Sequence, residues 1–410
     1  MIKSGGGAAP VDPFFEMIPD SEWNACVGSQ GVEENYVDGY IEAAIELASA
    51  VIDKKLYASR DTLAMPILYN GRHALELSLK FAINKLHRVG ALAAPHKPDH
   101  DILSHWAHLR DAKIGDTMIR TLVDELEPYV TSLSNIDNDG QELRYAKTQA
   151  GKKSLQTIAL VNLPHIRKSL DEMAKTLTRL KRRVHEFTDE CSTGTFTREC
   201  SRKDLRTIAE ALGAHKTWTE ENFVDRKIAI CKRFDLGSKE FSQALDKIKE
   251  SRELGVIVGL EQELHHLSDK KAFDVLRLWA KVNFLEKEDH EDLGLDFFNR
   301  DFDKVREHLR IRRELDDAVQ AILTSNELAD LEALFYIGRG PEYGESYDRV
   351  LQSTKASHGS TPAPDVHQIL SKTSLLENVA LGAQLVGRPS LAAKLRALRP
   401  NVDLDDAALS

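Results

Sequence analysis

The residues best spaced to bind a ligand form a basic stripe late in the first half of the chain. Four cations recur at spacings that place them on one face of a helix: Lys168, Lys175, Arg179 and Arg182. Arg167, Lys181 and Arg183 add positive charge nearby. Such a face can hold phosphate oxygens of RNA or of a nucleotide, and the phosphate contacts that we predict come from Lys168, Lys175, Arg182 and Arg183. A solvated helix face that binds nothing is the alternative interpretation.

Histidines crowd between His87 and His108, which raises the question of a metal site. His105 and His108 stand three residues apart, and His96 and His100 are close in sequence. Neither an HExxH register nor a CxxC pair accompanies them. The chain also lacks GxGxxG, Walker A and GxSxG motifs. We therefore expect no metal and no cofactor.

Composition favours long helices that position these residues. The chain has 410 residues, of which 42% are hydrophobic and 29% charged, with few prolines and tyrosines. The four cysteines form no CxxC pair and are interpreted as free thiols. No long uncharged apolar stretch or signal-peptide pattern occurs, so we expect a cytoplasmic protein without a membrane contact. A net charge of −10 argues against nonspecific coating of nucleic acid, but leaves room for a local basic face.

Apolar periodicity and breaks predict an all-α protein in four parts. These are a flexible N-terminal arm over 1–32, a helical bundle over 33–188, a second multi-helix domain over 200–352 and a small helical segment over 366–398. Within the bundle, the pattern predicts helices over 33–57, 59–87 and 153–187, the last bent at Pro164. The region 188–201 lacks a helical period and is the predicted domain boundary.

One part of the bundle carries a family resemblance. The segment YNGRHALELSLK, residues 69–80, places His73, Glu76 and Lys80 on one helical face, and HDIL follows at 100–103. This arrangement resembles the HEPN superfamily of four- or five-helix domains, over about residues 35–188. The loop 137–145, which ends in Leu-Arg-Tyr, resembles a polar segment of one branch of that superfamily. The structural alternative is that His100 and Asp101 cap a helix, while Glu76 and Lys80 form a simple ion pair.

The resemblance implies further residues and a chemistry. Ribonuclease members carry an arginine followed, after four to six residues, by a histidine, and two copies meet to cleave RNA. Arg179 and His185 match this spacing, although Leu180 stands where active members often carry a polar residue. By the resemblance, Arg179 would stabilise charge on the phosphate and His185 would transfer protons in a metal-independent endoribonuclease.

Two functions follow as hypotheses. The first is a HEPN-like homodimer that binds or processes RNA or a nucleotide in bacterial stress or phage defence, a setting implied by the resemblance. The second is a non-catalytic interaction or sensor module. In that case the first half dimerises, and residues 200–350 dock a partner protein or sense a ligand.

Overall fold

The chain folds into helices joined by short turns and loops. The structure, a computed structural model, describes residue 14 and residues 21–147, 151–156, 158–220, 222–288, 302–340, 343–358 and 366–399. These described residues contain 17 α-helices and no β-strand, which confirms the predicted all-α class. Most of the predicted N-terminal arm lies outside the described residues. None of the described helices combines the length and apolar character needed to cross a membrane.

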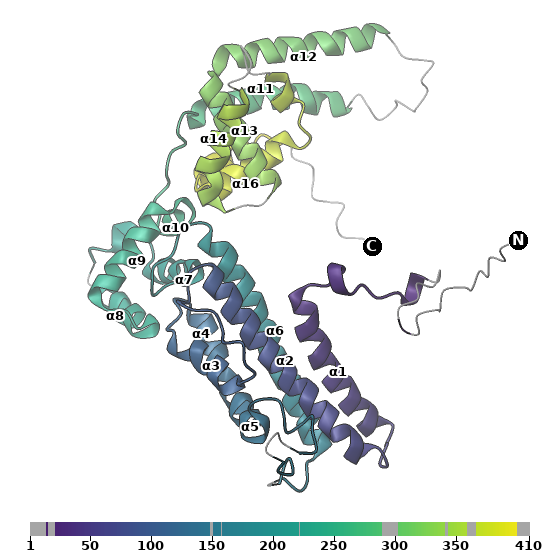
Figure 1. Cartoon of the computed structure of the whole chain (residues 1–410). Coiled ribbons are helices and arrows are strands. Elements are labelled where there is room, and N and C mark those ends of the chain that lie inside the picture. Colours follow the sequence, from purple (N-terminus) through teal and green to yellow (C-terminus); the bar gives the residue numbers. More distant parts are fainter. Residues whose placement is uncertain are drawn as a thin grey trace, which may run out of the picture. The chain divides into compact units, whose positions relative to one another are not determined.

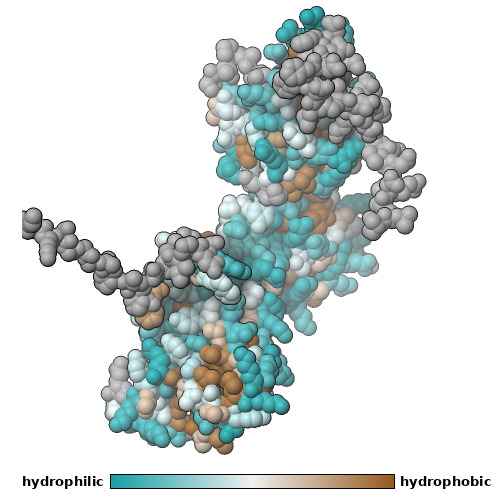
Figure 2. Space-filling view, turned by 90° about the vertical axis from the view of Figure 1, so that its right-hand side faces the viewer, coloured by the Kyte–Doolittle hydropathy of each residue, from teal (hydrophilic) through white to brown (hydrophobic). Residues whose placement is uncertain are grey.

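The chain divides into two compact units. Unit 1 consists of residues 1–87, 94–111 and 122–181, and unit 2 of residues 88–93, 112–121 and 182–410. The predicted boundary over 188–201 therefore falls within unit 2. On the face that Figure 2 shows, hydrophobic residues form patches that are surrounded by hydrophilic residues.

Six helices supply unit 1 (Figure 1): α1 (Glu33–Asp53), α2 (Arg60–Arg88), α3 (Ile102–Asp111), α4 (Thr117–Glu125), α5 (Glu127–Asp137) and α6 (Leu163–Cys191). Of these, α4, α6 and the last residue of α2 also enter unit 2. The apolar stripe of α1 is buried, as its three-and-four spacing predicts. Helices α2 and α6 pack closely at Gly71, where an added Cβ would collide with the side chain of Leu170. An ion pair between Lys181 and Asp38 joins α6 to α1.

Helix α6 begins ten residues later than the sequence pattern predicts. The prediction placed its start at Lys153, but Leu155 has a φ of +53° and the helix begins at Leu163. The side chain of Asn162 accepts a hydrogen bond from the backbone N–H of His165 at 2.9 Å, which caps the helix. Pro164 therefore lies in the first turn, where a missing N–H costs nothing, instead of bending a longer helix.

Two hydrophobic cores organise unit 2. The first includes apolar residues of the helices α7 (Arg202–Leu212), α8 (Asn222–Phe234), α9 (Ser238–Glu250) and α10 (Arg252–Ile257). A capping box between Ser201 and Asp204, a pattern readable in the sequence, begins α7. The apolar run at 255–259 forms the end of a helix, because its first three residues complete α10 and Gly259 turns the chain at a φ of +80°.

The second core draws on all the remaining helices, which are α11 (Asp269–Glu288), α12 (Phe302–Ile322), α13 (Ser325–Arg339), α14 (Tyr347–His358), α15 (Val366–Leu370), α16 (Leu375–Leu385) and α17 (Pro389–Arg396). The segment over 366–398 shares this core with α11–α14. Helices α13 and α16 approach so closely that a Cβ on Gly338 or Gly382 would overlap the backbone of the other helix. Glycine at both positions permits this contact.

Candidate functional site

The tightest cluster of charged groups in unit 1 surrounds Glu76, midway along α2. Its buried carboxylate accepts hydrogen bonds from Arg72 at 2.6 Å and Lys80 at 2.7 Å, one turn away on either side. His100 Nδ1 donates at 2.8 Å from the turn before α3, and His73 lies 3.7 Å away. Burial alone would raise the pKa of Glu76. The surrounding hydrogen-bond donors outweigh burial and hold that pKa well below its usual range.

Arg72 extends this cluster into a clasp between three segments. Its buried guanidinium donates to the backbone carbonyl of Asp137 at 2.7 Å and to that of Asn138 at 2.8 Å, at the end of α5. It also donates to the carbonyl of His100. The same side chain that pairs with Glu76 thus satisfies carbonyls on two loops.

The structural interpretation of the HDIL turn is confirmed in part. Asp101 accepts a hydrogen bond from the backbone N–H of Ser104 at 2.8 Å, which caps α3. The predicted ion pair between Glu76 and Lys80 is present. The side chain of His100 pairs with Glu76, which the capping interpretation did not predict.

Aromatic rings and an arginine stack beside His73, at one side of the Glu76 cluster. The guanidinium of Arg144 lies over the rings of Tyr69 and Tyr145, at 5.7 and 5.4 Å from their centroids. His73 stacks on Tyr69 at 5.6 Å and meets the ring of Tyr40 edge-on. Sequence reasoning did not select these residues as a site. The available signal was the i,i+4 spacing of Tyr69 and His73 together with the Arg-Tyr pair at the end of the loop.

The predicted basic stripe lies on the exposed side of α6. At about 100° per residue, its four cations fall within about 60° of one another around the helix axis and span about 21 Å along it. The exposed fraction of the side chain is 75% for Lys168, 45% for Arg179 and 67% for Arg182. Lys175 is also exposed. The structure therefore places these four predicted residues together on one accessible face.

Carboxylates neighbour three of these cations. Lys168 lies 3.9 Å from Glu172, Arg179 donates to Glu125 at 2.9 Å, and Arg182 lies 3.7 Å from Glu186, as the nitrogen-to-oxygen distances show. Every one of these pairs is substantially exposed to solvent. Exposed pairs contribute about 0–1 kcal/mol, because water screens them. These weak ion pairs orient the cations but can be replaced at low cost in free energy.

Arg183 does not belong to this face, which corrects its prediction as a phosphate contact. Its side chain is buried, and its guanidinium donates to Asp116 at 2.7 Å and to both carboxylate oxygens of Glu190 at 2.8 Å. Burial alone would lower the pKa of Arg183, but its hydrogen bonds to Glu190 and Asp116 raise that pKa. Arg182 and Arg183 are consecutive, but they point in different directions around the helix axis, so Arg182 is exposed and Arg183 is buried.

The two residues predicted to be catalytic lie on the same helix but point in different directions. Arg179 and His185 stand six positions apart on α6, which corresponds to about 120° around the axis and about 9 Å along it. Arg179 is exposed and paired with Glu125, whereas His185 is half-buried. One chain does not bring the two side chains to a common point, and catalysis by this pair stays a prediction.

Two of the histidines between 87 and 108 lie beside carboxylates. His100 binds Glu76, and His105 is buried with its Nε2 3.3 Å from a carboxylate oxygen of Asp99. Burial lowers the pKa of His105. Among the described residues, no group of three or more His, Cys, Asp or Glu side chains is placed to hold a metal ion.

Comparison with known proteins assigns no role to any residue of these sites. The resemblance of α2, the turn before α3 and the loop before α6 to the HEPN superfamily stays a prediction from the residues. The chain matches no protein-family model, no curated protein and no solved structure.

Proposed function

We propose that the protein binds the phosphate backbone of RNA through the exposed face of α6 that carries Lys168, Lys175, Arg179 and Arg182. The observation that carries the proposal is the alignment of these four exposed cations along about 21 Å of one helix. A single nucleotide would reach only part of that length. An extended strand presents successive phosphates and can engage the whole face.

Local charge supports binding despite the net charge of the chain. The exposed ion pairs on α6 cost about 0–1 kcal/mol each to break, so phosphate oxygens can replace the carboxylates at low cost. A protein with a net charge of −10 gains little from nonspecific attraction. Affinity must therefore come from these few cations and must fall with salt. For single-stranded RNA, removing one cation that binds a phosphate should reduce the salt slope by about 0.7.

The test compares two basic stripes on this chain. We expect Lys168→Ala, Lys175→Ala and Arg182→Ala, combined, to weaken the binding of labelled single-stranded RNA at least about tenfold and to lower the salt slope by about 2. The matched control neutralises the exposed residues Arg306, Arg310 and Arg313 of α12, where Arg310 pairs with Glu307. Fluorescence anisotropy over a range of salt concentrations measures both quantities.

The outcomes separate the hypotheses. If both triple variants weaken RNA binding equally, or neither does, the face on α6 is not an RNA site. The interaction-module hypothesis then takes its place. If a mononucleotide competes as well as RNA does, the ligand is a nucleotide and not a strand.

Cleavage of the bound RNA is a separate prediction, and we propose that it requires a homodimer. Because Arg179 and His185 diverge on one helix, a shared site needs residues from a second copy. RNA cleavage should then be abolished in Arg179→Ala and in His185→Ala. Equal behaviour of both variants and the unmodified protein would remove the nuclease hypothesis and leave binding intact.

A further inference from the structure

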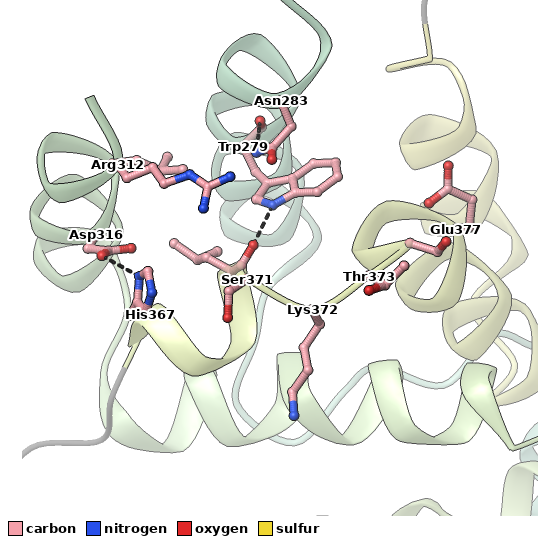
Figure 3. A pocket seen from close by; sticks show the side chains of 12 residues that line it. Trp279, Asn283, Arg312, Asp316, His367, Ser371, Lys372, Thr373 and Glu377 are labelled. Atoms are coloured by element: carbon pink, nitrogen blue, oxygen red, sulfur yellow. Dashed lines mark hydrogen bonds and ion pairs between the residues drawn. The ribbon is translucent and has the colours of Figure 1, made fainter. Parts of the chain in front are cut away.

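A cavity in unit 2 has walls of two different kinds. It has a volume of about 320 Å³ and is lined by residues of α11, α12, α15 and the start of α16 (Figure 3). One wall is apolar and consists of Trp279, Leu315 and Leu370, all buried. The opposite side carries hydroxyl groups from the turn that joins α15 to α16. A cavity of this size suits a small molecule and not a polymer.

The apolar wall is rigidly held. The indole N–H of Trp279 donates to the backbone carbonyl of Leu370 at 2.8 Å, so the ring of α11 is fixed against α15. One turn further along α11, the amide nitrogen of Asn283 donates to the carbonyl of Trp279 at 2.9 Å. An indole fixed in this way offers a flat surface to a flat ligand without loss of side-chain entropy on binding.

The polar side of the cavity is rich in hydrogen-bond donors. Thr373 and Ser374 contribute two exposed hydroxyls, whereas the hydroxyl of Ser371 donates to the backbone carbonyl of Gln368 at 3.3 Å. Ser374 has left-handed backbone angles and precedes the 11-residue helix α16 without a side-chain hydrogen bond that would cap it.

Arg312 brings a permanent positive charge to the cavity. The guanidinium of Arg312 reaches across the cavity toward Trp279, as Figure 3 shows. Both lining carboxylates have hydrogen-bond partners, Asp316 the Nδ1 of His367 at 3.0 Å and Glu377 the guanidinium of Arg399 at 2.8 Å. Lys372 points away from the cavity and donates to the hydroxyl of Tyr336.

We propose that this cavity binds a small phosphate monoester with a flat, apolar body. The phosphate lies between Arg312 and the hydroxyls of Thr373 and Ser374, and the body lies against Trp279. An arginine with several hydroxyl donors matches the many acceptor oxygens of phosphate. This site is independent of α6 and of the proposed RNA binding.

The test uses phenyl phosphate, with inorganic phosphate and benzoate as comparisons. Calorimetric titration of the full-length protein should show binding of phenyl phosphate, weaker binding of inorganic phosphate, which lacks the apolar body, and the weakest binding of benzoate. Arg312→Ala should weaken phenyl phosphate binding about tenfold or more, since it removes a charge-assisted hydrogen bond. Arg310→Ala is the matched control, because Arg310 lies on the same helix but pairs with Glu307 outside the cavity.

A second variant guards against a folding defect in the first. Thr373→Val keeps the shape of an exposed side chain and removes one hydroxyl, so it should weaken phenyl phosphate binding about fivefold. Absence of phenyl phosphate binding to the unmodified protein overturns the proposal. Equal weakening in Arg310→Ala and Arg312→Ala, benzoate binding as tight as that of phenyl phosphate, or unchanged affinity in Thr373→Val also overturns it.

Discussion

Glu76 shows how a single residue can tie several segments together. Its carboxylate binds two cations of its own helix and a histidine from a separate turn. The partner Arg72 is itself buried and donates to carbonyls at the end of α5 and in the turn before α3. Removing one member of a buried ion pair is costly, because the remaining charge stays out of water without compensation.

Glu76→Gln should therefore destabilise the protein by about 3 kcal/mol at neutral pH. Urea denaturation, followed by circular dichroism, measures the change in the free energy of unfolding. Glu210→Gln is the control, because Glu210 forms only an exposed pair with Arg206, and it should change stability by less than about 0.5 kcal/mol. Equal effects of the two substitutions would mean that the cluster does not act as a clasp.

The same substitution should change the response to acid. Because the folded-state pKa of Glu76 is lowered, the folded protein binds fewer protons than the unfolded chain at this group. The resulting stability is present above the unfolded pKa, near 4.5, and is lost as the pH falls below it. The stability difference between the unmodified protein and Glu76→Gln should accordingly narrow below that pH. A constant difference from about pH 7 to about pH 3 would contradict this origin.

Helix α6 shows how element boundaries depend on local chemistry. An asparagine cap and a first-turn proline set its start, although apolar residues continue the helical spacing further upstream. The start of α13 likewise has a capping box, between Thr324 and Glu327. Caps are sequence features, but a periodic pattern that extends past them obscures the boundary.

The contact between α13 and α16 gives a prediction about helix packing. Gly382→Ala should destabilise the protein by about 3 kcal/mol or more, because the added Cβ overlaps the backbone of Leu334 and the helices must separate. Gly39→Ala in α1 is the matched control, since its Cβ would meet nothing within 4 Å. That substitution should stabilise the protein by about 0.5–1 kcal/mol through helix propensity. Thermal denaturation distinguishes the two signs.

At the scale of the molecule, each unit contains buried residues whose contacts hold the helices of that unit together. Glu76 and its partners belong to unit 1, whereas Gly338 and Gly382 belong to a core of unit 2. Native proteins open locally in cooperative units, so the helices that share one buried cluster should open together.

Hydrogen exchange should therefore separate the two lesions. Glu76→Gln should speed amide exchange in α2, α3 and α5, and Gly382→Ala should speed it in α13, α16 and α17, as mass spectrometry of peptides would show. The unmodified protein provides the reference rates. A uniform increase over the whole chain in either variant would indicate one cooperative unit instead.

The sequence by itself determined the all-α class, the buried stripe of α1, the capping box at Ser201 and the common face of Lys168, Lys175, Arg179 and Arg182. These features depend on neighbours within a few residues, which a helical period and cap residues encode directly. The ion pair between Glu76 and Lys80 could be predicted from the sequence for the same reason.

Tertiary structure alone decided the remaining features. Burial of Arg183 depends on Asp116, distant in sequence, and the clasp at Arg72 depends on carbonyls at the end of α5. The cavity beside Trp279 gathers residues from two pairs of helices, α11 with α12 and α15 with α16, and the two pairs lie far apart in the sequence. Contacts of this kind follow from how helices pack, because side chains far apart in sequence meet only after the cores have formed.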